Sequence, residues 1–220
     1  MANETEKHPA PTTYLPLLID MKGKKTLVVG AGTIGTRRIK LLIDHGLKPL
    51  VISTSTSAEV DQWASEGKCL IIRRKFSPGD TAGCALVIAA TSNARTNGHV
   101  VEEAERNGAL ANRIDDPDCA IQIPGIVQRG KLQIAVSTSS ASPSFTRQLK
   151  RELEERFDEA YEPWIELLYQ VRRRVAERID DPARRASLLR ALAQEPYLER
   201  IRRGETFDPE QVYQQLIAQE

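Results

Sequence analysis

The stretch that decides the fold reads Lys25-Thr26-Leu27-Val28-Val29-Gly30-Ala31-Gly32-Thr33-Ile34-Gly35. Its apolar start predicts a short strand, and residues 33–45 continue beyond the glycines with helical spacing. Between a strand and a helix, Gly-x-Gly-x-x-Gly indicates a dinucleotide site, with phosphates bound by the free N–H groups of the first helical turn. The alternative is a glycine-rich turn that binds nothing. The cofactor-binding residues predicted from this motif are Gly30, Ala31, Gly32, Thr33, Ile34 and Gly35.

The residues around this motif alternate between strand and helix patterns. Three helical segments are expected at residues 33–45, 58–66 and 95–107. Short apolar segments typical of buried parallel strands are Lys25–Gly30, Pro49–Thr54, Cys69–Arg74, Ala85–Thr91 and Ala109–Ile114. The alternation predicts an α/β fold with a Rossmann-type doubly wound parallel sheet, the NAD-binding domain spanning residues 14–116.

The pattern changes after residue 116. Ala120–Val127 and Lys131–Ser137 read as two strands joined by a link too short for a parallel crossover, so we expect a hairpin over residues 117–141. Pro124 lies within the first of these segments and favours an edge or a bend. Because a lone hairpin is marginally stable in water, these strands are expected to pair with something else, and a second copy of the chain is one economical partner.

Residues 142–220 predict a helical domain. Ser142 is a candidate N-cap with Pro143 at the first helical position, and this helix is expected to continue towards Tyr161. Later helices are expected to start near Pro163, Pro182 and Pro209. The polar residues 1–13 are expected to be a disordered lead-in rather than a signal peptide.

Composition excludes several classes of function. A formal net charge of +1 gives no reason to expect nucleic-acid or membrane-surface binding, and no apolar run approaches the roughly 20 residues of a membrane span. The three cysteines are widely spaced, which predicts a reducing, cytoplasmic location. They and the three histidines show no metal-ligand spacing, so no metal site is predicted.

Two further segments are candidates for the cofactor site. The second strand ends in Ser53 and Thr54, where a carboxylate usually holds the ribose; with no Arg or Lys there either, NAD is favoured over NADP. The fourth strand ends in Ala90 and Thr91, small residues that leave room for a cofactor and could donate a hydrogen bond. The alternatives are an ordinary serine/threonine loop and close packing under a helix.

Asn112, Arg113 and Asp115 follow the fifth strand at the same rim of the sheet. A carboxylate there could act as general base when hydride leaves a substrate. The alternative is a capping role, as Asp181 is expected to have before Pro182. A loop of small hydroxyl residues, Ser137, Thr138 and Ser139 among them, precedes the next helix and is either an anion site or an ordinary capped loop.

Taken in order, these blocks resemble the precorrin-2 dehydrogenases, the siroheme-synthase dehydrogenase/ferrochelatase family. The blocks that carry the resemblance are Tyr14-Leu15-Pro16-Leu17, Gly30–Gly35, Ala89-Ala90-Thr91 with Asn97, Asn112-Arg113-Ile114-Asp115-Asp116-Pro117, Pro124, Arg129-Gly130-Lys131-Leu132, Ile134-Ala135-Val136-Ser137-Thr138 and Ser142-Pro143. The family often has glycine where Ser140 stands.

The resemblance implies NAD-dependent oxidation of precorrin-2 to sirohydrochlorin, with Asp115 as the base. It also implies a homodimer joined through the hairpin and, in bifunctional relatives, insertion of ferrous iron as a second substrate. For a substrate with carboxylates it suggests a pocket drawn from Asn112, Arg113, Arg129, Lys131, Arg147, Ser137, Thr138 and Ser139. Two rival readings are a non-catalytic NAD-sensing module and a chelatase or tetrapyrrole carrier without dehydrogenase activity.

Overall fold

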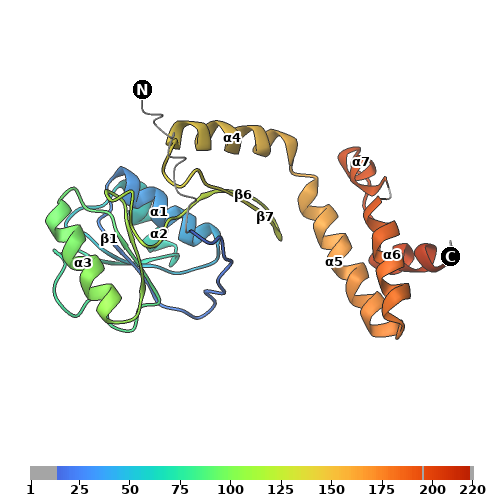
Figure 1. Cartoon of the computed structure of the whole chain (residues 1–220), viewed down its shortest axis with the longest axis horizontal. Coiled ribbons are helices and arrows are strands. Elements are labelled where there is room, and N and C mark those ends of the chain that lie inside the picture. The colour runs from blue at the N-terminus through green and yellow to red at the C-terminus, as the bar shows by residue number, and fades with distance from the viewer. Residues whose placement is uncertain (1–13, 195, 219–220) are drawn as a thin grey trace, which may run out of the picture. The chain divides into compact units, whose positions relative to one another are not determined.

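The computed structural model describes residues 14–194 and 196–218, and its contacts divide the chain into two units that meet at the Ile123–Pro124 bond. In the first unit, which contains β1 and α1 to α3 of Figure 1, five strands form one parallel sheet. Their order is β3-β2-β1-β4-β5. Its elements are β1 (Thr26–Val29), α1 (Thr33–Asp44), β2 (Leu50–Ile52), α2 (Ala58–Ser65), β3 (Leu70–Ile72), β4 (Leu86–Ala89), α3 (Ala94–Arg106) and β5 (Leu110–Arg113). The predicted doubly wound fold is confirmed.

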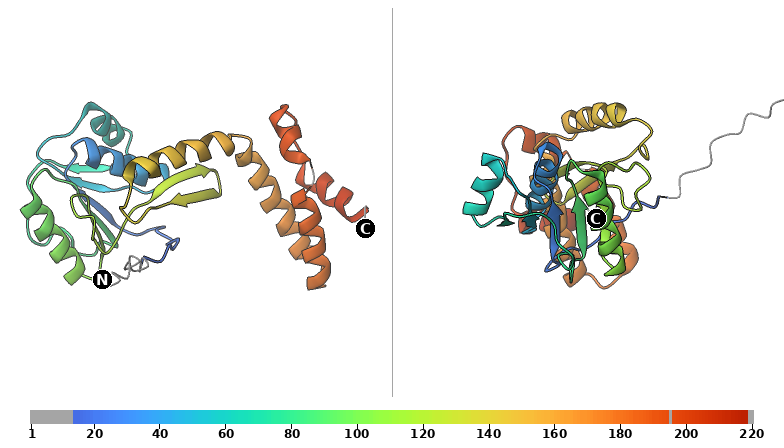
Figure 2. Two further views of the ribbon diagram at one scale, coloured as in Figure 1. Left: turned by 45° about the horizontal axis from the view of Figure 1, so that its top comes forward. Right: turned by 90° about the vertical axis from the view of Figure 1, so that its left-hand side faces the viewer.

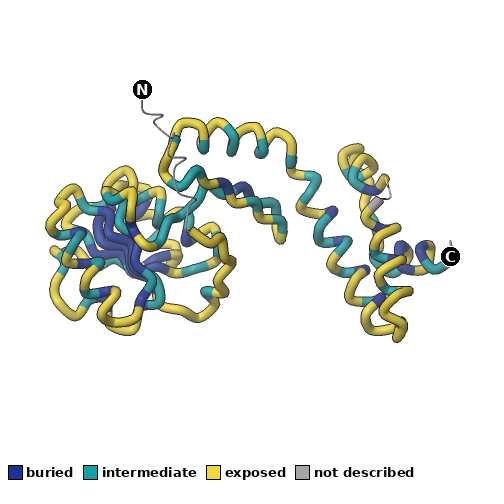
Figure 3. The backbone as a smooth tube through the Cα atoms, viewed as in Figure 1, coloured by how far each residue is buried: buried dark blue, intermediate teal, exposed yellow. Residues whose placement is uncertain are grey.

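Alternation along the strands builds a core on each face of this sheet. Leu27 and Val29 of β1 belong to a cluster with Val100 of α3, whereas Val28 between them belongs to a cluster with Ile39 of α1. In Figure 2, α1 and α2 (blue and cyan) cover one side of the sheet and α3 (green) covers the other. Figure 3 shows the buried residues concentrated on the central strands. Both faces are therefore covered along the central strands. The segment 69–74 was predicted to be a buried strand, but β3 lies at the edge of the sheet and leaves Leu70 54% and Ile72 40% exposed.

Residues 117–123 belong to the first unit. The Tyr14 hydroxyl donates to the carbonyl of Cys119 at 2.9 Å, and the Asn112 amide donates to the carbonyl of Ile121 at 2.7 Å. The domain limits predicted from sequence at residues 13, 116 and 141 stay predictions, and the expected lead-in at 1–13 lies outside the described residues.

The second unit begins with an antiparallel hairpin, β6 (Gly125–Arg129) and β7 (Leu132–Val136), closed by the two-residue turn Gly130-Lys131. Gly130 has φ +53°, in the left-handed region that such turns need. The hairpin is confirmed, but its first strand is shorter than predicted. It starts directly after Pro124, which has no N–H to give to a ladder, and residues 120–124 form no strand.

Five helices complete the second unit: α4 (Pro143–Arg156), α5 (Tyr161–Arg178), α6 (Pro182–Gln194), α7 (Tyr197–Arg202) and α8 (Pro209–Ala218). Ser142 caps α4 by accepting from the Phe145 N–H at 3.3 Å, as predicted. The helix ends at Arg156 rather than near Tyr161, since Phe157 leaves the helical conformation with ψ 78°. Trp164, Leu167 and Val171 on one face of α5 pack with residues of α6, α7 and α8 into a second core.

Within the described residues, no helix combines the length and hydropathy needed to cross a membrane. In the same part of the chain, no three His, Cys, Asp or Glu side chains are grouped as a metal site would need.

Candidate functional site

A cleft of about 500 Å³ opens in the first unit, beyond the carboxyl ends of the strands. It is lined by residues 30–32 of the β1–α1 turn, by residues 53–55 and 74–76 after β2 and β3, and by residues 90–93 after β4. This rim is where ligands bind in doubly wound sheets. The cleft therefore gathers segments that are far apart in the chain.

The three motif glycines occupy different environments. Gly30 has φ +99°, and a Cβ there would lie 2.5 Å from the carbonyl oxygen of Ala90. A Cβ on Gly35 would overlap the carbonyl oxygen of Gly30. A Cβ on Gly32 would meet nothing within 4 Å, so the backbone at Gly32 is open on the cleft side. This close-packed turn with one open position fits a pyrophosphate at the start of α1.

Ser53 braces this turn. Its hydroxyl accepts from the Ala31 N–H at 3.2 Å and donates to the carbonyl of Ser55 at 2.7 Å. Thr54 is exposed beside it and lines the cleft, while Thr33 and Ile34 are exposed in the first turn of α1. The hydroxyl proton of Ser53 is thus directed to backbone, and Thr54 is the better placed of the two predicted ribose contacts.

Two basic residues missed at the sequence level line the same cleft. Arg74 and Lys75 follow β3, which pairs with β2 in parallel, so both strands end at the same rim. Arg74 is held by Asp80 through two hydrogen bonds of 2.7 and 2.6 Å, and Lys75 is exposed. The argument against NADP from the absence of Arg and Lys after β2 is therefore incomplete, because the neighbouring strand supplies them.

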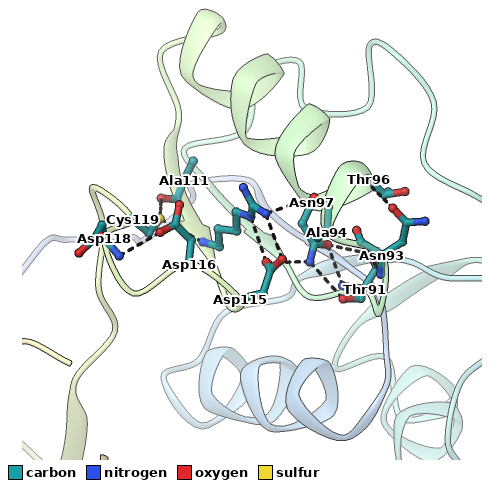
Figure 4. A network of polar contacts seen from close by, with 11 residues as sticks. Thr91, Asn93, Ala94, Thr96, Asn97, Ala111, Asp115, Asp116, Asp118 and Cys119 are labelled. Carbon is teal, nitrogen blue, oxygen red and sulfur yellow. Dashed lines mark hydrogen bonds and ion pairs between the residues drawn. The ribbon is translucent and has the colours of Figure 1, made fainter. Parts of the chain in front are cut away.

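Asp115 lies just beyond β5 and is held from two sides (Figure 4). Arg113 donates from Nε to Oδ1 at 3.0 Å and from Nη2 to Oδ2 at 3.1 Å. Asn97 of α3 donates from Nδ2 to Oδ1 at 3.0 Å. The Arg113 hydrogen bond is the main cause that holds the pKa of the Asp115 carboxyl below its ordinary value, against a smaller opposing effect of burial.

Thr91, at the end of β4, is bound to the same Asn97. The Asn97 Oδ1 accepts from the Thr91 N–H at 3.0 Å and from its hydroxyl at 2.7 Å, and Nδ2 donates to the Thr91 carbonyl at 3.1 Å. The Thr91 hydroxyl thus has two acceptors inside the protein, Asn97 Oδ1 and the Asn93 carbonyl at 3.1 Å, and its donation to a cofactor stays a prediction. Ala90 and Thr91 do line the cleft, as predicted.

Asn97 itself received no role from the sequence. It is fully buried, and with Val100 and Ala104 it follows the i, i+3, i+7 spacing of the buried face of α3. A polar residue on an otherwise apolar helix face was the signal that could have singled it out.

The remaining predicted site residues fall into two groups. Asn112 is 5% exposed, and its amide bonds the Ile121 carbonyl, which pins the segment after β5. Ser137, Thr138, Ser139 and Arg147 belong to the second unit, where the Thr138 hydroxyl contacts the Thr146 hydroxyl at 3.0 Å and accepts from the Ser142 N–H at 3.1 Å. The structure brings together the glycine turn, Thr91, Arg113 and Asp115 within the first unit.

Arg129 and Lys131 have acidic partners inside the second unit. Arg129 pairs with Glu159 at 3.4 Å, and Lys131 pairs with Glu166 and lies 4.6 Å from the centre of the Tyr169 ring. Glu159 is 84% exposed, and the Arg129 Nε has no hydrogen-bond partner within the described residues. That Arg129 and Lys131 meet a substrate stays a prediction.

Comparison with known proteins identifies the family of this chain. Residues 17–125 match a family described as NAD(P)-binding, and residues 129–156 match the central region of sirohaem biosynthesis proteins. A precorrin-2 dehydrogenase of Priestia megaterium is 35% identical over 157 residues, which cover 71% of this chain and 77% of that protein. This chain belongs to the precorrin-2 dehydrogenase family.

Other relatives extend the match. Siroheme synthases of Nitrosococcus oceani and Methylococcus capsulatus are 33% and 32% identical over 90% of this chain, which spans only 42% of their length. The solved structure of SirC, a precorrin-2 dehydrogenase, superposes with a TM-score of 0.73 at 28% identity and covers 93% of this chain and 100% of its own. The family and fold expected from the sequence are confirmed.

Proposed function

We propose that this chain oxidises precorrin-2 to sirohydrochlorin with NAD. The observation that carries the proposal is the Asp115 carboxylate, held by Arg113 and Asn97 next to the Thr91 backbone that lines the cleft. The family match supports the same activity, and no observation favours the NAD-sensing module or the carrier without dehydrogenase activity.

The oxidation removes one hydride and one proton from the tetrapyrrole. NAD, when bound, supplies the hydride acceptor; the Gly30–Gly32 turn would hold its pyrophosphate, with Thr54, Ala90 and Thr91 beside it. The chain must accept the proton, and the ionised carboxylate of Asp115 is suited to do so. Asp115 is 32% exposed in its side chain, so a substrate can reach it.

The basic and hydroxyl side chains are the groups that would bind the carboxylates of the substrate. A substrate carboxylate can replace Asp115 as the partner of Arg113, because guanidinium binds carboxylates in the same bidentate manner. That exchange raises the proton affinity of Asp115 when substrate arrives. Asn112, Ser137, Thr138, Ser139 and Arg147 stay candidate contacts of the substrate.

The assembly we propose is a homodimer located in the cytoplasm. The hairpin has only two strands, and none of the 14 residues of α4 is buried within the chain, which supports coverage by a second copy. All three cysteines are free and buried, as expected in a reducing compartment.

The deciding experiment incubates the purified protein with precorrin-2 and NAD and follows the absorbance of NADH and sirohydrochlorin. We expect both to appear, and Asp115→Asn to abolish turnover while NAD affinity, measured by calorimetry, stays the same. No product from the unaltered protein would refute the dehydrogenase proposal. Adding ferrous iron at the end tests the insertion activity that the resemblance implies.

A further inference from the structure

We propose that Asn97 is a positioning residue of this site, which fixes the Asp115 carboxylate to the Thr91 segment of the cleft and holds it in its charged form. The inference rests on the proposed function, in which Asp115 accepts the proton. Asn97 contacts neither the substrate nor the cofactor and acts only through its two partners, Thr91 and Asp115.

The hydrogen bonds leave the Asn97 amide a single orientation. The Thr91 N–H is a donor, so the atom 3.0 Å from it must be the amide oxygen. The amide nitrogen then faces the Thr91 carbonyl at 3.1 Å and Asp115 Oδ1 at 3.0 Å. Two donors and two acceptor positions are all used, which is the full capacity of an asparagine. Thr91, Asn97 and Asp115 thus form one connected unit, as Figure 4 shows.

This unit joins three elements of the sheet rim. Thr91 follows β4, Asn97 lies in the first turn of α3, and Asp115 follows β5. Asn97 is fully buried, so it has no solvent with which to exchange its partners. If the Thr91 segment moves, the Asp115 carboxylate is therefore expected to move with it, because the Asn97 amide that links the two cannot bind water instead.

The charged groups around Asp115 are few in the described structure. Arg113 pairs with it, and the Asp116 carboxylate acts on Arg113 from the same segment. From α3, Asn97 and the Ala94 carbonyl face this pair, and neither titrates. Asn97 can therefore be changed without removing either partner of the Arg113–Asp115 ion pair.

Asn97→Asp separates positioning from packing. The new carboxylate can still accept from the Thr91 N–H and hydroxyl, but it presents a like charge to Asp115 where a donor stood. The matched control is Asn107→Asp at the other end of the same helix, where the amide donates to the Thr81 hydroxyl at 2.8 Å. Both changes exchange an amide for a carboxylate, and only one faces Asp115.

The test is a carboxyl NMR titration of the full chain, with the Asp115 signal assigned by its loss in Asp115→Asn. We expect the Asp115 midpoint to rise by about one pH unit or more in Asn97→Asp and to stay unchanged in Asn107→Asp. Asn97→Ser, which removes the donor without adding charge, should raise it by less and is the deciding variant, because the buried carboxyl of Asn97→Asp can take up a proton and donate to Asp115 again.

An unchanged Asp115 midpoint in folded Asn97→Ser would overturn the proposal. In the enzyme assay, the acid limb of kcat/KM for Asn97→Asp should move in the same direction as the titration. If the unaltered protein gives no turnover, the proposed function has failed, and the NMR titration still decides the role of Asn97.

Discussion

At the scale of single residues, the three motif glycines serve different purposes. Gly30 and Gly35 are required by packing, because a Cβ at either would overlap backbone atoms of the turn or of the Ala90 segment. Gly32 has open space where its Cβ would point. Substitution of Gly30 or Gly35 should therefore impair folding, whereas substitution of Gly32 should impair only the binding of NAD.

Gly32→Ala should fold normally and bind NAD at least tenfold more weakly, about 1.4 kcal/mol, because the added methyl group occupies the approach of the pyrophosphate. Calorimetry with NAD and thermal unfolding measure the two effects. Gly30→Ala is the control and should lower Tm, since its Cβ would lie 2.5 Å from the Ala90 oxygen. Normal NAD affinity in Gly32→Ala would contradict this account of the turn.

A second residue-scale prediction concerns Ser140, which has φ 66°, next to Ser139 at φ 48°. The left-handed conformation costs a non-glycine residue about 1–2 kcal/mol, and glycine loses about 0.5–1 kcal/mol through the greater freedom of its unfolded chain. Ser140→Gly should therefore raise the unfolding free energy by about 0.5–1 kcal/mol. Urea denaturation checks it, and Ser144→Gly inside α4 should be destabilising instead.

At the scale of elements, α5 and α8 are joined by a carboxylate with two arginine partners. Glu210 at the start of α8 accepts from Arg178 Nη1 at 2.5 Å and from Arg174 Nε at 3.1 Å. The Arg178 hydrogen bond is the main cause that lowers the pKa of Glu210 to about 2. Salt screens exposed ion pairs of this kind, so their effect on stability should be measured at low ionic strength.

The pH dependence follows from the sign of that shift. Because the folded-state pKa of Glu210 is depressed, its stabilising effect is complete above its unfolded value near 4.3 and is lost as the pH falls towards about 2. In Glu210→Gln, the midpoint of urea unfolding should decrease less steeply as the pH falls through this range. Glu177→Gln, which removes the exposed 3.4 Å pair with Arg173, should leave the slope as it is.

At the scale of the whole molecule, the hairpin and α4 predict association. We expect a sedimentation mass of twice the 24.5 kDa of the chain. Phe145 is 51% exposed on α4, so Phe145→Ser should shift the equilibrium towards monomer, whereas Arg151→Ser on the same helix should not. A monomer at every concentration would refute the homodimer.

How far the sequence alone reaches differs between the fold and the site. The strand–helix alternation, the hairpin and the Ser142 cap were all predicted, because each depends on neighbours within a few positions. The start of β6 and the end of α4 were missed by several residues, since strand and helix limits depend on which partners are available. Asp115 was singled out by its place after a strand, whereas its ion pair with Arg113 was not foreseen.

The sequence by itself determined the parallel sheet and the glycine turn, because apolar periodicity and the positive φ of Gly30 are local properties of the chain. Only the tertiary structure decided what meets at the rim. The strand order puts β3 beside β2, so that Lys75 lines the cleft, and it puts α3 over β4 and β5. Asn97 thereby joins Thr91 and Asp115, three residues whose separations along the chain gave no sign of contact.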